Sequence, residues 1–493
     1  MKRSKTSLSY TKLLSCDTGQ LVPVGLTEVL PGDTFHAATS CLVRFSPLLA
    51  PVMHPTHVQL SHWFVPHRLV WDDWEEFITG GPDGNNSSDH PVIDTGAGFA
   101  VGSLADYLGV PPGVASQEVN ALPFRGYALI WNEWFRDQDL ETELTIDTSD
   151  GTDSTTSVDL QFAAWEKDYF TTARPWEQKG PSVTIPLGTS APVTGLGASS
   201  QSPIGSGTTA YETDGTGGTA YADYWASAAG AGFVIEEDPN NAGFPNVRVD
   251  LSQASAANVN LIREAFALQR FEEARARYGS RYTEYLRYLG VKSSDARLQR
   301  PEFLSGGRYP IQFSEVLQTA EGSDPVGELR GHGIGAARSN RYLRFFEEHG
   351  YVFTLMTIKP KAIYANGLFR TWNRRVKEDY WQKELQHIGQ QEVLNKEVYL
   401  AHSSPEEVFG YQDRYDEYRR SESSIAGEFR STLDFWHFAR IFGSDPALNA
   451  SFVSCVPPDR PFAVESTNQL YVMAKHQIHA RRLVAQKGTS YIY

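Results

Sequence analysis

The most constraining feature of this chain is a strand-like alternation close to its C-terminus, over residues 470–483. Apolar or small residues alternate there with polar, aromatic or basic ones: the first set is Leu470, Val472, Ala474, Ile478 and Ala480, and the second is Tyr471, Met473, Lys475, Gln477, His479 and Arg481. Because successive side chains of a strand point to opposite faces of a sheet, we expect one buried face here and one wet, partly basic face.

Other segments extend this pattern to the rest of the chain. Residues 34–45, 57–65 and 351–358 are rich in Thr, Val and aromatic residues, as strands are. Residues 256–278 predict an amphipathic helix that stops at Gly279, and residues 281–289 predict a second one. Strands near both ends with helices and long loops between them predict an antiparallel β-sandwich with large connections.

Composition narrows the class of protein. The chain has 493 residues, of which 41% are hydrophobic, and its 27 Pro and 41 Gly indicate many turns. Three widely spaced cysteines make a disulfide framework or a Cys-based zinc site implausible. The basic start lacks the apolar region of a signal peptide, and no stretch has the roughly 18 apolar residues of a membrane span, so we expect neither export nor insertion.

Charge is distributed unevenly. The net charge is −15, yet both ends are basic: residues 1–12 carry Lys2, Arg3, Lys5 and Lys12, residues 475–493 carry Lys475, Arg481, Arg482 and Lys487, and neither stretch contains an acid. These basic ends on an acidic body are the candidate contacts with a polyanion such as DNA. The plainer alternative is that the termini are only solvated.

Residues 186–248 differ in kind from the rest, because Ser, Thr, Gly and Ala dominate and charge is nearly absent until Glu236. By composition this stretch is either a flexible linker or a surface insertion. Its aromatic residues, including Tyr211, Tyr221, Tyr224 and Trp225, favour the insertion.

No grouping of residues predicts catalysis. The histidines 54, 57, 62 and 67 are separated by strand geometry and prolines, so we expect no metal site and no cofactor. The acid pairs 72/73, 75/76 and 137/139 are interpreted as solvated or paired with Arg68 and Arg136. The glycines of residues 331–335 predict a tight turn. Tryptophan clusters are expected to be core or interface anchors.

Seven blocks carry a resemblance to a known family: residues 30–35 (LPGDTF), 64–81 (FVPHRLVWDDWEEFITGG), 165–180 (WEKDYFTTARPWEQKG), 269–273 with 278–282 (QRFEE, YGSRY), 295–304 (DARLQRPEFL), 409–415 (FGYQDRY) and 433–439 (LDFWHFA). They resemble the major capsid proteins of microviruses, the small tailless single-stranded DNA phages, and most of all the gokushovirus-like branch. The resemblance runs from about residue 20 to about residue 460, except over 186–248. Glu177 stands where the family pattern has a proline.

The resemblance implies an eight-stranded antiparallel jelly roll with large loop and helical insertions. Its parts would be residues 1–185 (first part of the core, with a basic N-terminal arm), 186–248 (a protrusion at the three-fold axes that contacts the host) and 249–493 (helical insertions, the remaining strands and a basic C-terminal segment). It also implies a non-enzymatic protein of the virion, assembled in the host cytoplasm.

The implied partners follow from such a particle. They are other copies of the chain, about 60 in a T=1 icosahedral shell with pentamer and trimer contacts, a circular single-stranded DNA genome, a small basic DNA-binding virion protein, a pilot or minor virion protein, and a host cell-surface receptor. The alternative from another class is a β-sandwich protein that binds or processes glycans, which the aromatic residues and acid pairs would suit.

Shortening residues 190–245 is expected to leave particle assembly intact and to change adsorption to the host, because the stretch lacks the apolar periodicity of a core segment. Sedimentation measures the yield of particles, and a binding assay with host cells measures their adsorption. Loss of all soluble protein on deletion would show that the stretch belongs to the core.

Overall fold

The computed structural model describes residues 3–181, 183, 193–194, 196–198, 210–212, 219–220, 248–249, 259–279, 281–292, 294–319 and 326–485. The chain forms two compact units, one made of residues 1–177 with 276–493 and the other of residues 178–275. The boundaries predicted at residues 186 and 248 both fall inside the second unit. None of the described helices is long and apolar enough to cross a membrane.

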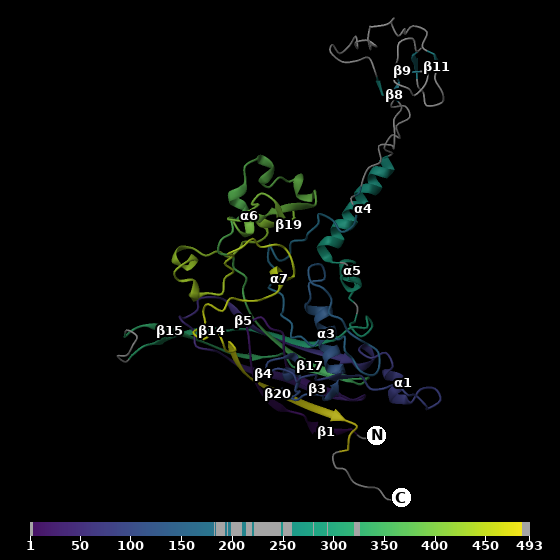
Figure 1. Ribbon diagram of the computed structural model, residues 1–493, viewed down its shortest axis with the longest axis vertical. Helices are drawn as coiled ribbons and strands as arrows, with labels where there is room; N and C mark the ends of the chain where they lie inside the picture. Colours follow the sequence, from purple (N-terminus) through teal and green to yellow (C-terminus); the bar gives the residue numbers. More distant parts are fainter. Residues whose placement is uncertain are drawn as a thin grey trace, which may run out of the picture. The chain divides into compact units, whose positions relative to one another are not determined.

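The first unit is built on two antiparallel sheets (Figure 1). The seven-stranded sheet consists of β1 (Ser4–Ser7), β2 (Tyr10–Cys16), β4 (Thr34–Phe45), β14 (Gln312–Leu317), β15 (Leu329–Arg338), β16 (Tyr342–Phe345) and β20 (Leu470–Arg482). The four-stranded sheet consists of β3 (Val22–Val29), β5 (Thr56–Pro66), β13 (Glu302–Pro310) and β17 (Gly350–Pro360).

The order of pairing identifies the topology. Strand β2 pairs with β20, β3 with β17, β4 with β15 and β5 with β13, so the first half of the chain pairs with the second half in reverse order. A long hairpin rolled up in this way is a jelly roll. Strands β1 and β2 share one position beside β20, and β15 and β16 share one beside β4. The predicted eight-stranded antiparallel jelly roll is confirmed.

The main core lies between the two sheets. Alternate residues of β4 and β20, such as Val43 and Val472, meet alternate residues of β5 and β17, such as Val58 and Met356, and all four are at most 3% exposed. This is the buried face that the alternation at residues 470–483 predicts. The predicted strands 34–45, 57–65 and 351–358 correspond to β4, β5 and β17.

The second face of the four-stranded sheet is also buried. The connection from β5 to β13 supplies helices α2 (Leu104–Leu108) and α3 (Leu122–Ile130). Phe124 and Tyr127 of α3 pack with Trp63 and Phe353 of the sheet. The same connection contains α1 (Trp74–Thr79), β6 (Val92–Asp94), β7 (Glu118–Asn120) and α5 (Tyr282–Tyr288). No comparable cover lies over the outer face of the seven-stranded sheet in the described residues, where β20 alternates between buried and exposed positions.

The connection from β17 to β20 forms a satellite with its own core. It contains β18 (Gln390–Leu394), α6 (Asn395–Val398), β19 (Val408–Asp413) and α7 (Ala450–Val453). Phe409 and Phe452 from this connection pack with Trp165 and Phe170, which belong to the block at residues 165–180. That block is therefore a structural anchor, as expected of the tryptophan clusters.

The second unit contains short strands and most of the longest helix. The strands are β8 (Val193–Thr194), β9 (Leu196–Ala198), β10 (Ala210–Glu212), β11 (Thr219–Ala220) and β12 (Arg248–Val249). Helix α4 (Val259–Tyr278) begins in this unit and ends at Gly279, whose φ of +92° suits a glycine. Helices α4 and α5 confirm the two helices predicted at residues 256–278 and 281–289.

The turn predicted at residues 331–335 is wrong, because these residues lie inside strand β15. The glycines serve close packing instead. A Cβ atom at Gly331 would lie 2.1 Å from the Ala50 carbonyl oxygen, and one at Gly335 would lie 2.6 Å from Cδ1 of Ile311. At these glycine positions the core-facing side of the strand has no room for a side chain, and only the sheet contacts reveal this.

A polar chain crosses the core between the two sheets. His62 Nε2 lies 2.9 Å from Ser339 Oγ, the Thr39 amide donates to the same Oγ at 2.9 Å, and Thr39 Oγ1 lies 2.9 Å from His476 Nδ1. His476 Nε2 donates to the Val24 carbonyl at 3.0 Å. Burial lowers the pKa of His62 to about 3 and that of His476 to about 4, so both rings are held neutral.

Acid is therefore expected to destabilise the first unit. An unfolded histidine takes up a proton below a pKa of about 6.5, whereas these buried rings do not, so each contributes full stability above that pH and loses roughly 1.4 kcal/mol per pH unit as the pH falls toward the folded pKa. Replacing both (His62→Gln with His476→Gln) should flatten the fall in unfolding free energy between pH 6.5 and pH 5, measured by urea denaturation of the soluble subunit.

The matched control is His387→Gln, because His387 is exposed. It should leave the pH dependence unchanged. An equally steep fall in the double variant would contradict the assignment of acid sensitivity to the buried pair.

Candidate nucleic-acid interface

The outer face of the seven-stranded sheet carries cations and no acid. Register places Lys5 opposite Arg481, Lys475 opposite Ser40, and Arg338 opposite Ser40 on its other side. Glu315 of β14 is the one acid in the seven strands, and it pairs with Gly331 on the core side. We call the part of this surface that lies over β1, β2, β20, β4, β16 and residues 334–338 of β15 the basic face; its fixed charges are Arg3, Lys5, Arg44, Arg338, Lys475 and Arg481. Arg330 lies on the same side of β15 beyond this part and pairs with Glu328 at 2.9 Å.

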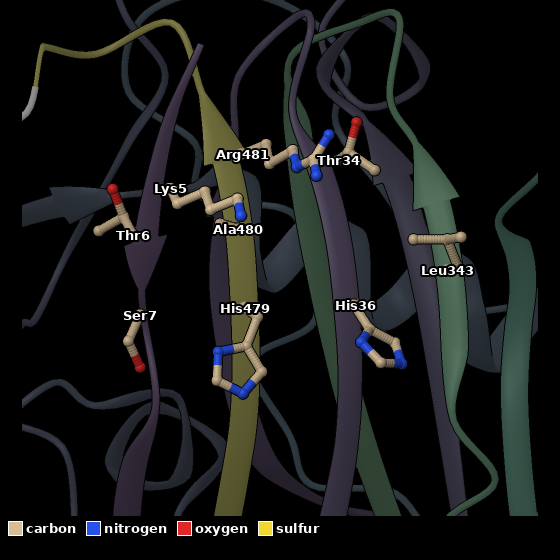
Figure 2. A pocket seen from close by; sticks show the side chains of 9 residues that line it. All are labelled: Lys5, Thr6, Ser7, Thr34, His36, Leu343, His479, Ala480 and Arg481. Carbon is tan, nitrogen blue, oxygen red and sulfur yellow. The ribbon is translucent and has the colours of Figure 1, made fainter.

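A groove of about 680 Å³ crosses the basic face over β1, β20, β4 and β16 (Figure 2). Lys5 and Arg481 line one part of it, and the rings of His36 and His479, which are direct cross-strand neighbours, line another. Leu343 of β16 closes the far side. Four side chains with N–H donors thus converge on one hollow, which suits an anionic ligand.

Arg3 extends the positive charge at the edge of the groove. Its Nη1 donates to the Gly32 carbonyl at 3.0 Å and to Thr34 Oγ1 at 2.9 Å, and its guanidinium lies 5.5 Å from the ring centre of Phe345. Both hydrogen-bond partners are neutral. The charge of Arg3 therefore remains available to a polyanion.

A second hollow of about 470 Å³ lies on the same face and is more apolar. Tyr471, Met473 and Leu13 line it and are 46%, 43% and 75% exposed, and Arg44 stands beside them. An exposed aromatic ring next to a guanidinium is the arrangement on which unpaired bases stack. The basic face thus offers both phosphate and base contacts.

The predicted basic residues do not all reach this face. Lys2 and Lys487 lie outside the described residues. Lys12 lies on the core side of β2, opposite Ala474, where its Nζ donates to the carbonyls of Pro23 and Tyr107, and burial lowers its pKa to about 8. Arg482 is neutralised, because its Nε donates to Asp33 Oδ2 at 2.9 Å. Arg3, Lys5, Lys475 and Arg481 do share the face.

Sequence reasoning missed four residues of this face: His36, Arg44, Arg338 and His479. It looked for runs of charge near the termini, whereas these cations are isolated in sequence and are brought together by strand pairing. The detectable signal was the absence of acids at alternate positions of residues 34–45, the strand that lies beside β20.

Of the residues predicted for a host-contact protrusion, Tyr221, Tyr224 and Trp225 lie outside the described residues. Tyr211 is part of β10, which pairs with β9 and β11, but its side chain is not among those described. Their role stays a prediction.

The histidines 54, 57, 62 and 67 are dispersed. His54 Nε2 lies 2.7 Å from the Lys361 carbonyl, while the His67 ring packs 4.5 Å from that of Trp74. Within the described part of the chain, no three His, Cys, Asp or Glu side chains are grouped to hold a metal ion.

The acid pair 137/139 has a different partner from the one predicted. Both carboxylates reach Arg174, Asp137 at 3.1 Å and Asp139 at 3.5 Å, whereas Arg136 lies 4.0 Å from Glu143. Arg68 pairs with Glu348 at 2.5 Å. The partners of Asp137, Asp139 and Arg68 are remote in sequence, so local inspection could not reveal these pairs.

Comparison with known proteins gives matches along nearly the whole chain. The family described as "Capsid protein (F protein)" matches residues 1–491. Capsid protein VP1 of Bdellovibrio phage phiMH2K is 37% identical, over 94% of this chain and 90% of that protein. Capsid protein VP1 of Chlamydia phage 1 is 33% identical, over 94% and 91%, and that of Spiroplasma virus 4 is 32% identical, over 92% and 87%. The glycan-binding alternative finds no support among them.

Proposed function

Because this chain belongs to the capsid protein (F protein) family, and is thus a structural protein of a virion, we propose that its basic face is the surface that meets the packaged genome. The resemblance to the gokushovirus-like microvirus capsid proteins is confirmed by the same relatives. The genome contact is the further step, and it rests on charge.

The positive charge of the basic face is the main support for the proposal. The chain as a whole has a net charge of −15, so a face with six fixed cations and no acid is a local exception. The negative charge of the rest of the chain would repel DNA. The basic face would attract it, because each phosphate that a cation neutralises releases condensed counterions. The groove and the adjacent hollow with Tyr471 provide the two kinds of contact that single strands need.

The size of the charge limits its role. In a shell of about 60 copies, six cations each give roughly 360 positive charges. The gene for a chain of 493 residues alone needs about 1,480 nucleotides, each with one phosphate charge. The basic face therefore orders part of a genome, and a small basic virion protein or small cations must neutralise the rest.

The proposed particle is a T=1 icosahedral shell around circular single-stranded DNA, with a pilot or minor virion protein and a surface that contacts a host receptor. Catalysis has no part in this function. Support for this particle comes from the resemblance to microvirus capsid proteins and from relatives named as capsid proteins of two phages and of Spiroplasma virus 4.

The proposal is tested by removing charge from the groove. The triple change Lys5→Gln, Lys475→Gln and Arg481→Gln should leave shell formation intact, because all three side chains are exposed, and should lower the DNA content per shell. Binding of the soluble subunit to a single-stranded oligonucleotide should become less dependent on salt, with the negative slope of log K against log salt reduced in magnitude by about 2.

The control removes the same charge elsewhere: Arg375→Gln, Lys377→Gln and Lys383→Gln, all exposed on the connection from β17 to β20. It should match the unmodified protein. Equal effects in the two triple variants, or an unchanged slope and DNA content in the first, would refute the assignment of the genome contact to this face.

A further inference from the structure

The hairpin of β14 and β15 extends beyond the jelly roll. The two strands pair from Gln312 with Ile334 to Leu317 with Leu329, but β4 supports β15 only from Ile334 to Arg338, because β4 ends at Phe45. A single bridge from Leu48 to Gly331 is the last support from the rest of the chain. The outer half of the hairpin projects from the sheet as a two-stranded ribbon (Figure 1).

This ribbon carries large apolar side chains into solvent. Val316, Leu317, Val326 and Leu329 are 50%, 51%, 60% and 36% exposed. Leu317 and Leu329 are direct cross-strand partners, and they share a face with Phe313, whose ring lies 5.2 Å from that of Phe45 in the core. Leu317 and Leu329 thus form an exposed apolar pair on the ribbon beyond the core, with Glu315 between this pair and Phe313 on the same face.

The ribbon also has an open edge. Strand β14 pairs with β15 and with no other described strand. The Gln318 amide donates to the Glu328 carbonyl at 3.0 Å, which directs the main-chain groups of even-numbered residues of β14 toward β15. The N–H and C=O groups of Phe313, Glu315 and Leu317 therefore point away from the hairpin, and such an edge is a site for strand addition.

We propose that the β14–β15 ribbon is an assembly arm that packs on a second copy of this chain. A two-stranded ribbon is marginal in water and needs a third strand or a packed face, which the described residues of its own subunit do not provide. The genome is a poor occupant, because Glu315 lies on the same face as Leu317 and would repel phosphate.

A capsid protein meets copies of itself at high local concentration in every particle. Four apolar side chains and an open edge are one part of the roughly 1,600 Å² that a stable subunit contact buries. This inference rests on membership of the capsid family and not on the proposed genome contact, so either can fail alone.

Charge placed on the apolar pair Leu317 and Leu329 tests the proposal. In the full chain, Leu317→Asp with Leu329→Asp should lower the yield of particles at least about tenfold, because two side chains buried on association become charged. Thermal melting of the unassembled subunit should not change, since Leu317 and Leu329 are already exposed in it. The control Leu317→Met with Leu329→Met keeps an apolar surface and should assemble normally. Particle yield within about twofold of the unmodified chain would overturn the proposal.

A second measurement decides the case even if the charged variant is insoluble. A photoreactive p-benzoylphenylalanine in place of Leu317 should form covalent dimers of the chain in assembled particles and none after the particles are dissociated. Cross-links to DNA or to another protein, or no cross-link within intact particles, would show that a second copy does not cover the arm.

Discussion

The pairing of β20 with β4 is the interaction on which the rest of the structure depends. It runs from Leu470 beside Phe45 to Arg481 beside Thr34, and it joins the last described strand to one of the first. Because side chains alternate along both strands, this register sends Val472, Val43 and Ala474 into the core and Lys475, Arg44 and Arg481 to the outside. A shift by one residue would exchange the two sets, so apolar burial fixes the basic face at the same time as it fixes the fold.

The two sheets of the first unit differ in how their faces are covered. The four-stranded sheet is covered on its second face by α2 and α3, and its strands β5 and β17 are buried along most of their length. Among the described residues nothing covers the outer face of the seven-stranded sheet, and its projecting hairpin has an open edge along β14. Long connections from β5 to β13 and from β17 to β20 add cores of their own without disturbing the nested pairing, because they enter and leave at strand ends.

The sequence predicted what depends on local pattern and missed what depends on distant partners. The alternation of residues 470–483 predicted β20 with its buried face, and the composition of residues 34–45 predicted β4 as a strand. The jelly roll came from the family resemblance. The glycines of residues 331–335 looked like a turn because their neighbours, the Ala50 carbonyl and Ile311, are remote in sequence. Lys12 was grouped with its basic neighbours, although it lies opposite Ala474 and therefore on the core side of β2. Lys5 belongs to a paired strand rather than to a loose terminal arm.

The central claim is that the face left free by this pairing is the face that meets DNA. A density map of the intact particle from electron cryomicroscopy tests it most directly, because it shows the radial direction of every strand. The account predicts that Lys475 and Arg481 point to the interior and that density not explained by protein lies in the groove of Lys5, His36 and His479. A map in which this face points to the outside of the shell, or is filled by a neighbouring subunit, would contradict it.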